Sequence, residues 1–180
     1  AAFFMTLVKG LLKALANDRQ NPLEILCQTN QLFYKNVERG HFISMVFGIL
    51  DGNSGEFRFA RAGHNPILML VGQSTKGEWF TPKGAGIGLL PDEKFREIIA
   101  EVKIRLQPDD VLVLYTDGYP EAMNDKLQEF GEERLQGIIA QNREKTPEEM
   151  IKNLEIQIKK WMGSQPPLDD RTIIVIKRGQ

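Results

Sequence analysis

Apolar residues recur at helical spacing at the start of the chain. Those that fall on one face of the predicted helix at residues 1–16 are Phe4, Leu7, Val8, Leu11, Leu12 and Leu15. Asn17 is a suitable residue to end this helix. A second amphipathic helix is predicted to begin at Asn21, which can cap it, with Pro22 at the first helical position and Glu24 completing a capping-box-like pattern.

The pattern becomes strand-like after residue 40. A hairpin is predicted first, because turn residues (DGNSG) separate two strand-like runs. A third strand is expected to extend this hairpin, followed by a loop and a glycine-rich run at residues 83–90. The short connections predict a mainly antiparallel sheet. Strands are predicted at residues 41–50, 57–62, 67–71, 98–106 and 111–115, the last two joined by a tight turn at residues 107–110.

Helices return in the last third of the chain. One is predicted at residues 132–142, and a second is expected to reach about Trp161 from a capping box formed by Thr146 and Glu149. The segment GSQPP then ends the helix, and residues 172–177 (TIIVIK) are predicted as a short buried strand. Because helices and strands are segregated along the chain, the pattern predicts an α+β layered domain and not a doubly wound one.

Composition and charge narrow the class of protein. The 180 residues, 42% of them hydrophobic, suit one domain with a sizeable core. With 23 basic and 24 acidic residues, the chain has no overall electrostatic field that would favour binding to nucleic acid or to an anionic membrane. The single cysteine, Cys27, excludes an intrachain disulfide and favours a reducing compartment, the cytoplasm, with the thiol expected as a buried packing residue. The apolar opening run is interpreted as a core helix, with interfacial membrane binding as the minor alternative.

Acidic residues stand at the ends of two strongly apolar strands. Asp117 and Gly118 follow VLVLY, and Asp169 with Asp170 precedes TIIVIK. Carboxylates at strand tips suit hard divalent ions such as Mg²⁺ or Mn²⁺. The alternative is that both segments are ordinary solvated turns, since Asp-Gly is a common turn dipeptide.

Other residues that could take part in catalysis or bind a metal or cofactor do not match the patterns of known sites. His41 and His64 lack zinc-hydrolase spacing, and a structural hydrogen bond or a capped turn is expected for His64. The run GAGIGLL resembles a dinucleotide fingerprint only loosely, because no parallel βαβ unit surrounds it. Ser44 and Ser164 lack the histidine and acid that a serine hydrolase needs.

An ordered set of motifs resembles the SpoIIE/RsbU-type phosphatases, a branch of the metal-dependent PPM serine/threonine phosphatases. The set is HFISMVFGILD, FRFARAGHNP, GIGLLP, DDVLVLYTDGYPEAMN, FGEERL and DDRTIIVIK, and it covers nearly the whole chain. The resemblance implies an αββα sandwich of two antiparallel sheets flanked by helix pairs, with a two-metal centre of Mn²⁺ or Mg²⁺ at one end of the sheets.

The resemblance also assigns roles to individual residues. It implies that Asp117 and Asp169 bind metal, that Asp170 is a weaker candidate ligand, and that Thr172 holds its turn. Residues 62–66 (AGHNP) are expected to shape the sheet end without a catalytic side chain, and neither a catalytic group beyond the metal ligands nor an organic cofactor is implied.

The resemblance implies a hydrolase that acts on a phosphorylated signalling protein, such as an anti-sigma-factor antagonist with a STAS fold, in a partner-switching pathway. The family's other metal-binding aspartates precede a helix that resembles residues 1–16. Residues 1–180 are therefore expected to form a single phosphatase domain that lacks its first strands and has little activity alone. The missing strands would leave exposed sheet edges, which favour a homodimer. A sensory or receiver domain is expected upstream. The alternative function is a non-catalytic module of the same fold that binds a partner or oligomerises.

Overall fold

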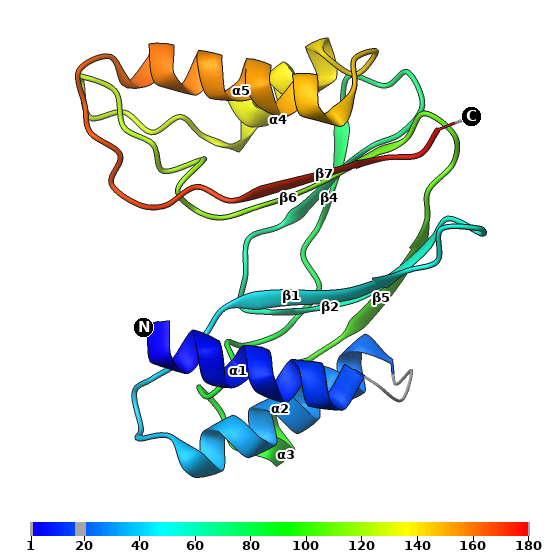
Figure 1. Cartoon of the computed structure of the whole chain (residues 1–180), viewed down its shortest axis with the longest axis vertical. Coiled ribbons are helices and arrows are strands. Elements are labelled where there is room, and N and C mark those ends of the chain that lie inside the picture. Colours follow the sequence, from blue (N-terminus) through cyan, green and yellow to red (C-terminus); the bar gives the residue numbers. More distant parts are fainter. Residues whose placement is uncertain (1, 17–20, 180) are drawn as a thin grey trace. The chain divides into compact units, whose positions relative to one another are not determined.

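The computed structural model describes residues 2–16 and 21–179, so Ala1 and the expected helix end at Asn17 lie outside the described residues. The chain forms two compact units, each with its own antiparallel sheet and its own helices (Figure 1). Unit 1 comprises Ala1–His64 and Thr81–Arg105, and unit 2 comprises Asn65–Phe80 and Leu106–Gln180. No helix within the described residues is long and apolar enough to cross a bilayer.

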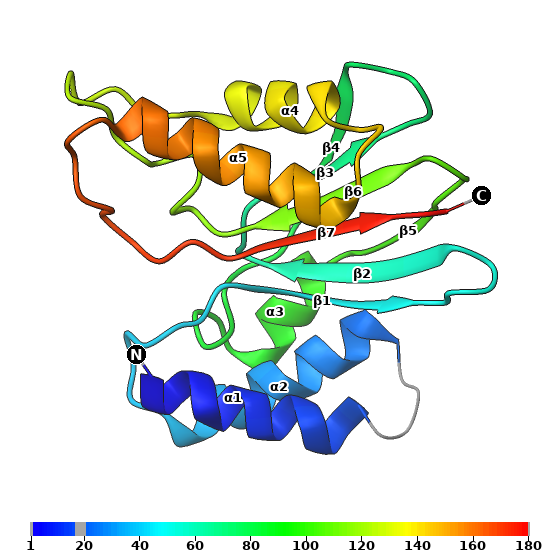
Figure 2. The same cartoon turned by 45° about the horizontal axis from the view of Figure 1, so that its top comes forward.

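Unit 1 combines a three-stranded sheet, in the order β1-β2-β5, with helices on one of its faces (Figures 1 and 2). Its core includes Val8, Leu26, Phe33 and Phe95, which come from all three helices and are almost fully buried. The elements of unit 1 are α1 (Ala2–Leu15), α2 (Pro22–Asn36), β1 (Met45–Leu50), β2 (Glu56–Ala62), α3 (Asp92–Ile98) and β5 (Glu101–Arg105).

The start of α2 confirms the predicted cap. The Asn21 side chain accepts a hydrogen bond from the backbone amide of Glu24 over 2.7 Å, and Pro22 occupies the first turn. The Glu24 carboxylate does not close a capping box. It accepts instead from Gln28, and it pairs with Arg96 of α3 over 2.9 Å, which ties two helices of unit 1 together.

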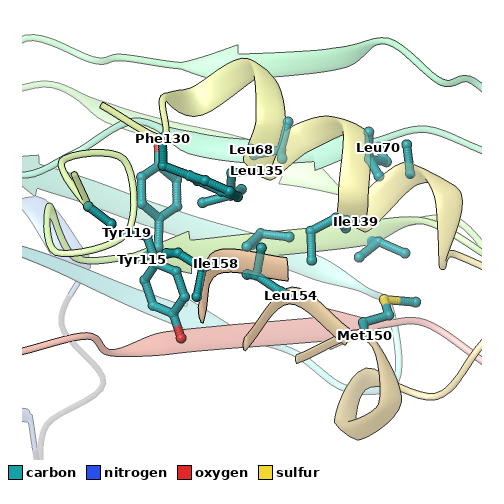
Figure 3. Close-up of a cluster of buried hydrophobic side chains, with 14 of the residues drawn as sticks. Leu68, Leu70, Tyr115, Tyr119, Phe130, Leu135, Ile139, Met150, Leu154 and Ile158 are labelled. Atoms are coloured by element: carbon teal, nitrogen blue, oxygen red, sulfur yellow. The ribbon is translucent and has the colours of Figure 1, made fainter. Parts of the chain in front are cut away.

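Unit 2 has a four-stranded antiparallel sheet in the order β4-β3-β6-β7, with α4 and α5 on one face (Figure 2). Side chains from the sheet and both helices meet in the core drawn in Figure 3. The predicted capping box of α5 is present, because Thr146 and Glu149 each bond the other's backbone amide. The elements of unit 2 are β3 (Ile67–Leu70), β4 (Gly77–Phe80), β6 (Val111–Tyr115), α4 (Glu132–Gln141), α5 (Pro147–Met162) and β7 (Ile173–Lys177).

The structure confirms the α+β class and the antiparallel pairing but corrects the expected strand partners. The third strand does not extend the first hairpin, because β5 occupies the second edge of β2 and β3 pairs with β4 and β6. The tight turn at residues 107–110 likewise connects strands of different sheets, not two hairpin partners. Two elements were not predicted: α3, which includes the first residue of the strand expected at 98–106, and β4, which lies in the expected loop.

Candidate functional site

The acidic turns lie side by side at one end of the unit 2 sheet. Strands β6 and β7 run antiparallel, with Tyr115 opposite Ile173. The chain that leaves β6 therefore meets the chain that enters β7. One residue further on, the amide of Thr116 donates to the carbonyl of Thr172 over 3.0 Å. Asp117 thus lies at the same end of the sheet as Asp169 and Asp170, although about fifty residues separate them in sequence.

The turn that contains Asp117 approaches the other turn through a glycine. The Asp117 side chain is exposed and its carbonyl accepts from the amide of Glu121 over 3.0 Å, which closes the turn. Gly118 is buried, and a Cβ atom at this position would lie only 2.6 Å from the carbonyl oxygen of Asp170. Because this distance is too short for any side chain, glycine is required for the two turns to approach this closely.

The second turn exposes both of its aspartates. One carboxylate oxygen of Asp169 accepts from the amide of Asp170 over 2.7 Å, and the carbonyl of Asp170 accepts from the Thr116 hydroxyl over 3.3 Å. Thr172 bonds Thr116 through both its backbone groups, with its amide donating to the Thr116 hydroxyl over 2.9 Å. Thr172 therefore holds the turn, as the resemblance implies.

A polar network that the sequence did not reveal lies next to both turns. The hydroxyl of Tyr119 donates to one oxygen of Glu155 on α5 over 2.6 Å, and Arg171 donates to the other oxygen over 3.2 Å. Burial, with the bond to Glu155, raises the pKa of Tyr119 above its ordinary value, so its hydroxyl keeps its proton at neutral pH. Tyr119 and Arg171 stand directly beside the acidic motifs, whereas no local pattern marks Glu155.

The chemistry of these turns fits a hard divalent ion. Asp117, Asp169 and Asp170 offer exposed carboxylate oxygens, the donors that Mg²⁺ and Mn²⁺ prefer, and Gly118 leaves room for the two backbones to converge. Within residues 2–16 and 21–179, no group of three or more histidine, cysteine, aspartate or glutamate side chains could hold an ion by itself.

The remaining candidate residues have packing or structural roles. Cys27 is fully buried, and desolvation raises the pKa of its thiol to about 11, so it stays a neutral packing group. The His41 ring packs against Phe4 with centroids 4.5 Å apart, and the carbonyl of His64 accepts from Arg61. Ser164 bonds Asp125 over 2.7 Å.

The glycine-rich run also has a structural role. Ile87 exchanges backbone hydrogen bonds with Ile43, of 3.0 and 2.8 Å, just before β1. The run thus pairs as an antiparallel bridge within unit 1. It does not form the strand-to-helix turn of a dinucleotide site.

Comparisons with known proteins identify the family and the fold of the chain. The family model described as Stage II sporulation protein E (SpoIIE) matches residues 1–179. Phosphoserine phosphatase RsbU of Bacillus subtilis (strain 168) is 26% identical over 179 residues, which are 99% of this chain and 51% of RsbU. The chain thus spans about half the length of this curated relative.

Two solved structures show the same fold. The SiaA-PP2C domain of Pseudomonas aeruginosa has a TM-score of 0.81 at 18% identity, covering 98% of this chain and 68% of that one. RsbX in complex with magnesium has a TM-score of 0.63 at 11% identity, covering 96% and 71%. The fold is that of PP2C-type phosphatase domains. The chain belongs to the SpoIIE family.

Proposed function

We propose that this chain belongs to a metal-dependent protein serine/threonine phosphatase in which Asp117 and Asp169 bind metal and Asp170 is a second candidate ligand. The observation that carries the proposal is the contact between the two acidic turns, in which Thr116 and Thr172 bond each other and Gly118 meets Asp170. Family membership and the relative named as a phosphoserine phosphatase support the same activity. We further propose that both units are parts of a single phosphatase domain.

The proposed role of the chain is to hold carboxylates where divalent ions can bind. Mn²⁺ or Mg²⁺, when bound, would activate water and neutralise the charge of a phosphoryl group. The magnesium complex of RsbX, which shares the fold, supports a divalent ion for this chain. The hydrogen bonds between Thr116 and Thr172, one between backbone groups and one to the Thr116 hydroxyl, hold the two turns together through protein groups alone, and this lowers the cost of assembling the site.

The exposure of the candidate ligands favours a protein substrate. Asp117, Asp169 and Asp170 all have exposed side chains at a sheet end, where a phosphate carried on another protein can reach them. A site for a small molecule is more often a concave pocket that buries its ligand. We therefore propose phosphoserine or phosphothreonine on a cytoplasmic signalling protein, such as a STAS-type anti-sigma-factor antagonist, as the substrate, and a partner-switching pathway as the context.

A non-catalytic module remains the second candidate function. It is favoured by one observation: within the part of the chain that the structure describes, the acidic side chains form no complete metal site. Such a module would keep the SpoIIE fold and bind a partner without turnover.

Phosphate release distinguishes the two functions. The full-length gene product should release phosphate from a phosphoserine-containing STAS protein when Mn²⁺ or Mg²⁺ is present, and EDTA should abolish the release. The same protein phosphorylated on tyrosine is a matched control that should stay intact. Release that persists unchanged in EDTA would contradict metal dependence, and binding of the phosphoprotein without release would favour the non-catalytic module.

A further inference from the structure

We propose that Glu155 is a positioning residue, which connects the two acidic turns and fixes the spacing of their aspartates. This inference rests on the proposed metal site. The Glu155 carboxylate accepts from the Tyr119 hydroxyl on one oxygen, over 2.6 Å, and from Arg171 on the other, over 3.2 Å. One planar group therefore bonds a residue from each turn at once.

The two partners of Glu155 lie within one or two residues of the candidate ligands in the chain. Tyr119 follows Asp117 by two residues within the same turn, and Arg171 directly follows Asp170. Because both oxygens of a carboxylate belong to one rigid group, these bonds set the separation between the Tyr119 hydroxyl and the Arg171 guanidinium. The guanidinium carbon of Arg171 also lies 6.0 Å from the centre of the Tyr119 ring, so the two turns contact each other beside Glu155 as well.

Glu155 itself sits on a firmly packed helix. Its neighbour Leu154 and the residue Ile158, one turn further along α5, are fully buried in the core of unit 2 (Figure 3). The ring of Tyr119 is in the same core. In the ion pair, the Arg171 side chain is 19% exposed and the Glu155 side chain 39% exposed, so the pair is shielded mainly on the Arg171 side. The carboxylate is thus held by a rigid element, which is what a supporting group for a metal site requires.

A second tyrosine–glutamate pair in unit 2 provides a matched control. The Tyr115 hydroxyl donates to Glu132 on α4 over 2.7 Å, and Tyr115 is as buried as Tyr119. This bond joins β6 to α4, and neither of its two residues belongs to an acidic turn. Removing the Glu132 carboxylate therefore costs a similar hydrogen bond without releasing one turn from the other.

The test compares Glu155→Gln with Glu132→Gln in the full-length gene product. Binding of Mn²⁺ is measured directly, from the electron paramagnetic resonance signal of the free ion. Glu155→Gln should weaken Mn²⁺ binding about tenfold, the low end of the range for groups that orient metal ligands, because its amide cannot accept from Arg171 and Tyr119 as the carboxylate does. Glu132→Gln should stay within about twofold of the wild type.

A measurement without metal separates this inference from the proposed function. Hydrogen exchange of the Thr172 amide, which bonds the Thr116 hydroxyl, should accelerate in Glu155→Gln and not in Glu132→Gln. Equal Mn²⁺ affinity in Glu155→Gln and wild type, or an equal loss in both variants, would overturn the proposal. If the wild-type protein binds no Mn²⁺, the proposed metal site fails, and unchanged exchange at Thr172 would then overturn the role of Glu155 as well.

Discussion

Thr116 and Thr172 bond each other in both directions just beyond the paired ends of β6 and β7. The amide of Thr116 donates to the carbonyl of Thr172 over 3.0 Å, and the amide of Thr172 donates to the hydroxyl of Thr116 over 2.9 Å. This pair continues the strand ladder up to the acidic turns. The sheet therefore brings the turns that carry Asp117 and Asp169 to the same end, and the contacts between the turns set the spacing of the two side chains.

Gly118 should tolerate no side chain. In Gly118→Ala, the new Cβ would lie 2.6 Å from the Asp170 carbonyl oxygen, so the turns must separate, at a cost of about 2 kcal/mol in unfolding free energy. Gly137→Ala is the matched control, because Gly137 lies within α4 with nothing within 4 Å of its added Cβ. That change should stabilise the protein by up to about 1 kcal/mol. Urea unfolding measures both, and equal effects would contradict the close approach of the turns.

Asp110 should act as a structural anchor at the other end of β6. The residue is 1% exposed, and its carboxylate accepts from the amides of Gly72 and Gln107, over 2.8 and 2.7 Å. In Asp110→Ala both amides lose a charged acceptor, which should lower the free energy of unfolding by about 2–4 kcal/mol. Asp110→Asn keeps one acceptor oxygen and should cost roughly half as much. Thermal or urea unfolding that detects no loss in the alanine variant would refute this role.

Local sequence signals were sufficient where an element is long or well capped. The cap at Asn21 and the capping box at Thr146 predicted α2 and α5 within about two residues. Helix α3 has seven residues and only one buried side chain, Phe95, so its sequence shows no repeat of apolar residues at helical spacing. Strand β4 has four residues that begin with Gly77, a poor strand former, and its pairing with β3 is a tertiary effect.

The site was predictable only in part. Antiparallel neighbours place the residue after one strand beside the residue before the next, so the proximity of Asp117 and Asp169 follows once β6 and β7 pair. The network of Tyr119, Glu155 and Arg171 joins three distant segments, and only the fold brings it together. For the same reason, the pairing of β2 with β5 was not visible in the sequence.

The ion pair between Glu24 and Arg96 should make unit 1 less stable in acid. The Arg96 hydrogen bond holds the pKa of Glu24 below its ordinary value of 4.5, against the opposing effect of desolvation. A lowered carboxyl pKa means that this stabilisation is complete above the unfolded-state pKa and is lost as the pH falls through the folded-state pKa. Both side chains are about one-third exposed, so Glu24→Gln should cost less than about 1 kcal/mol at pH 7.

The pH dependence of this difference is the check. Unfolding free energies of wild type and Glu24→Gln should converge as the pH falls below the ordinary carboxyl range of about 4. A difference that stays constant from pH 7 to pH 3 would show that Glu24 stabilises unit 1 without its charge.

The central claim is that Asp117 binds a catalytic metal ion. The most direct measurement is Mn²⁺-dependent phosphate release from a phosphoserine-containing STAS protein by Asp117→Asn in the full-length gene product. Asp109→Asn is the control. It removes a carboxylate at the opposite end of β6, and the backbone φ of 69° at this position is one that asparagine also adopts. We predict that Asp117→Asn loses activity by about 100-fold or more while Asp109→Asn stays within about twofold of the wild type. Wild-type activity in a folded Asp117→Asn variant would contradict the account.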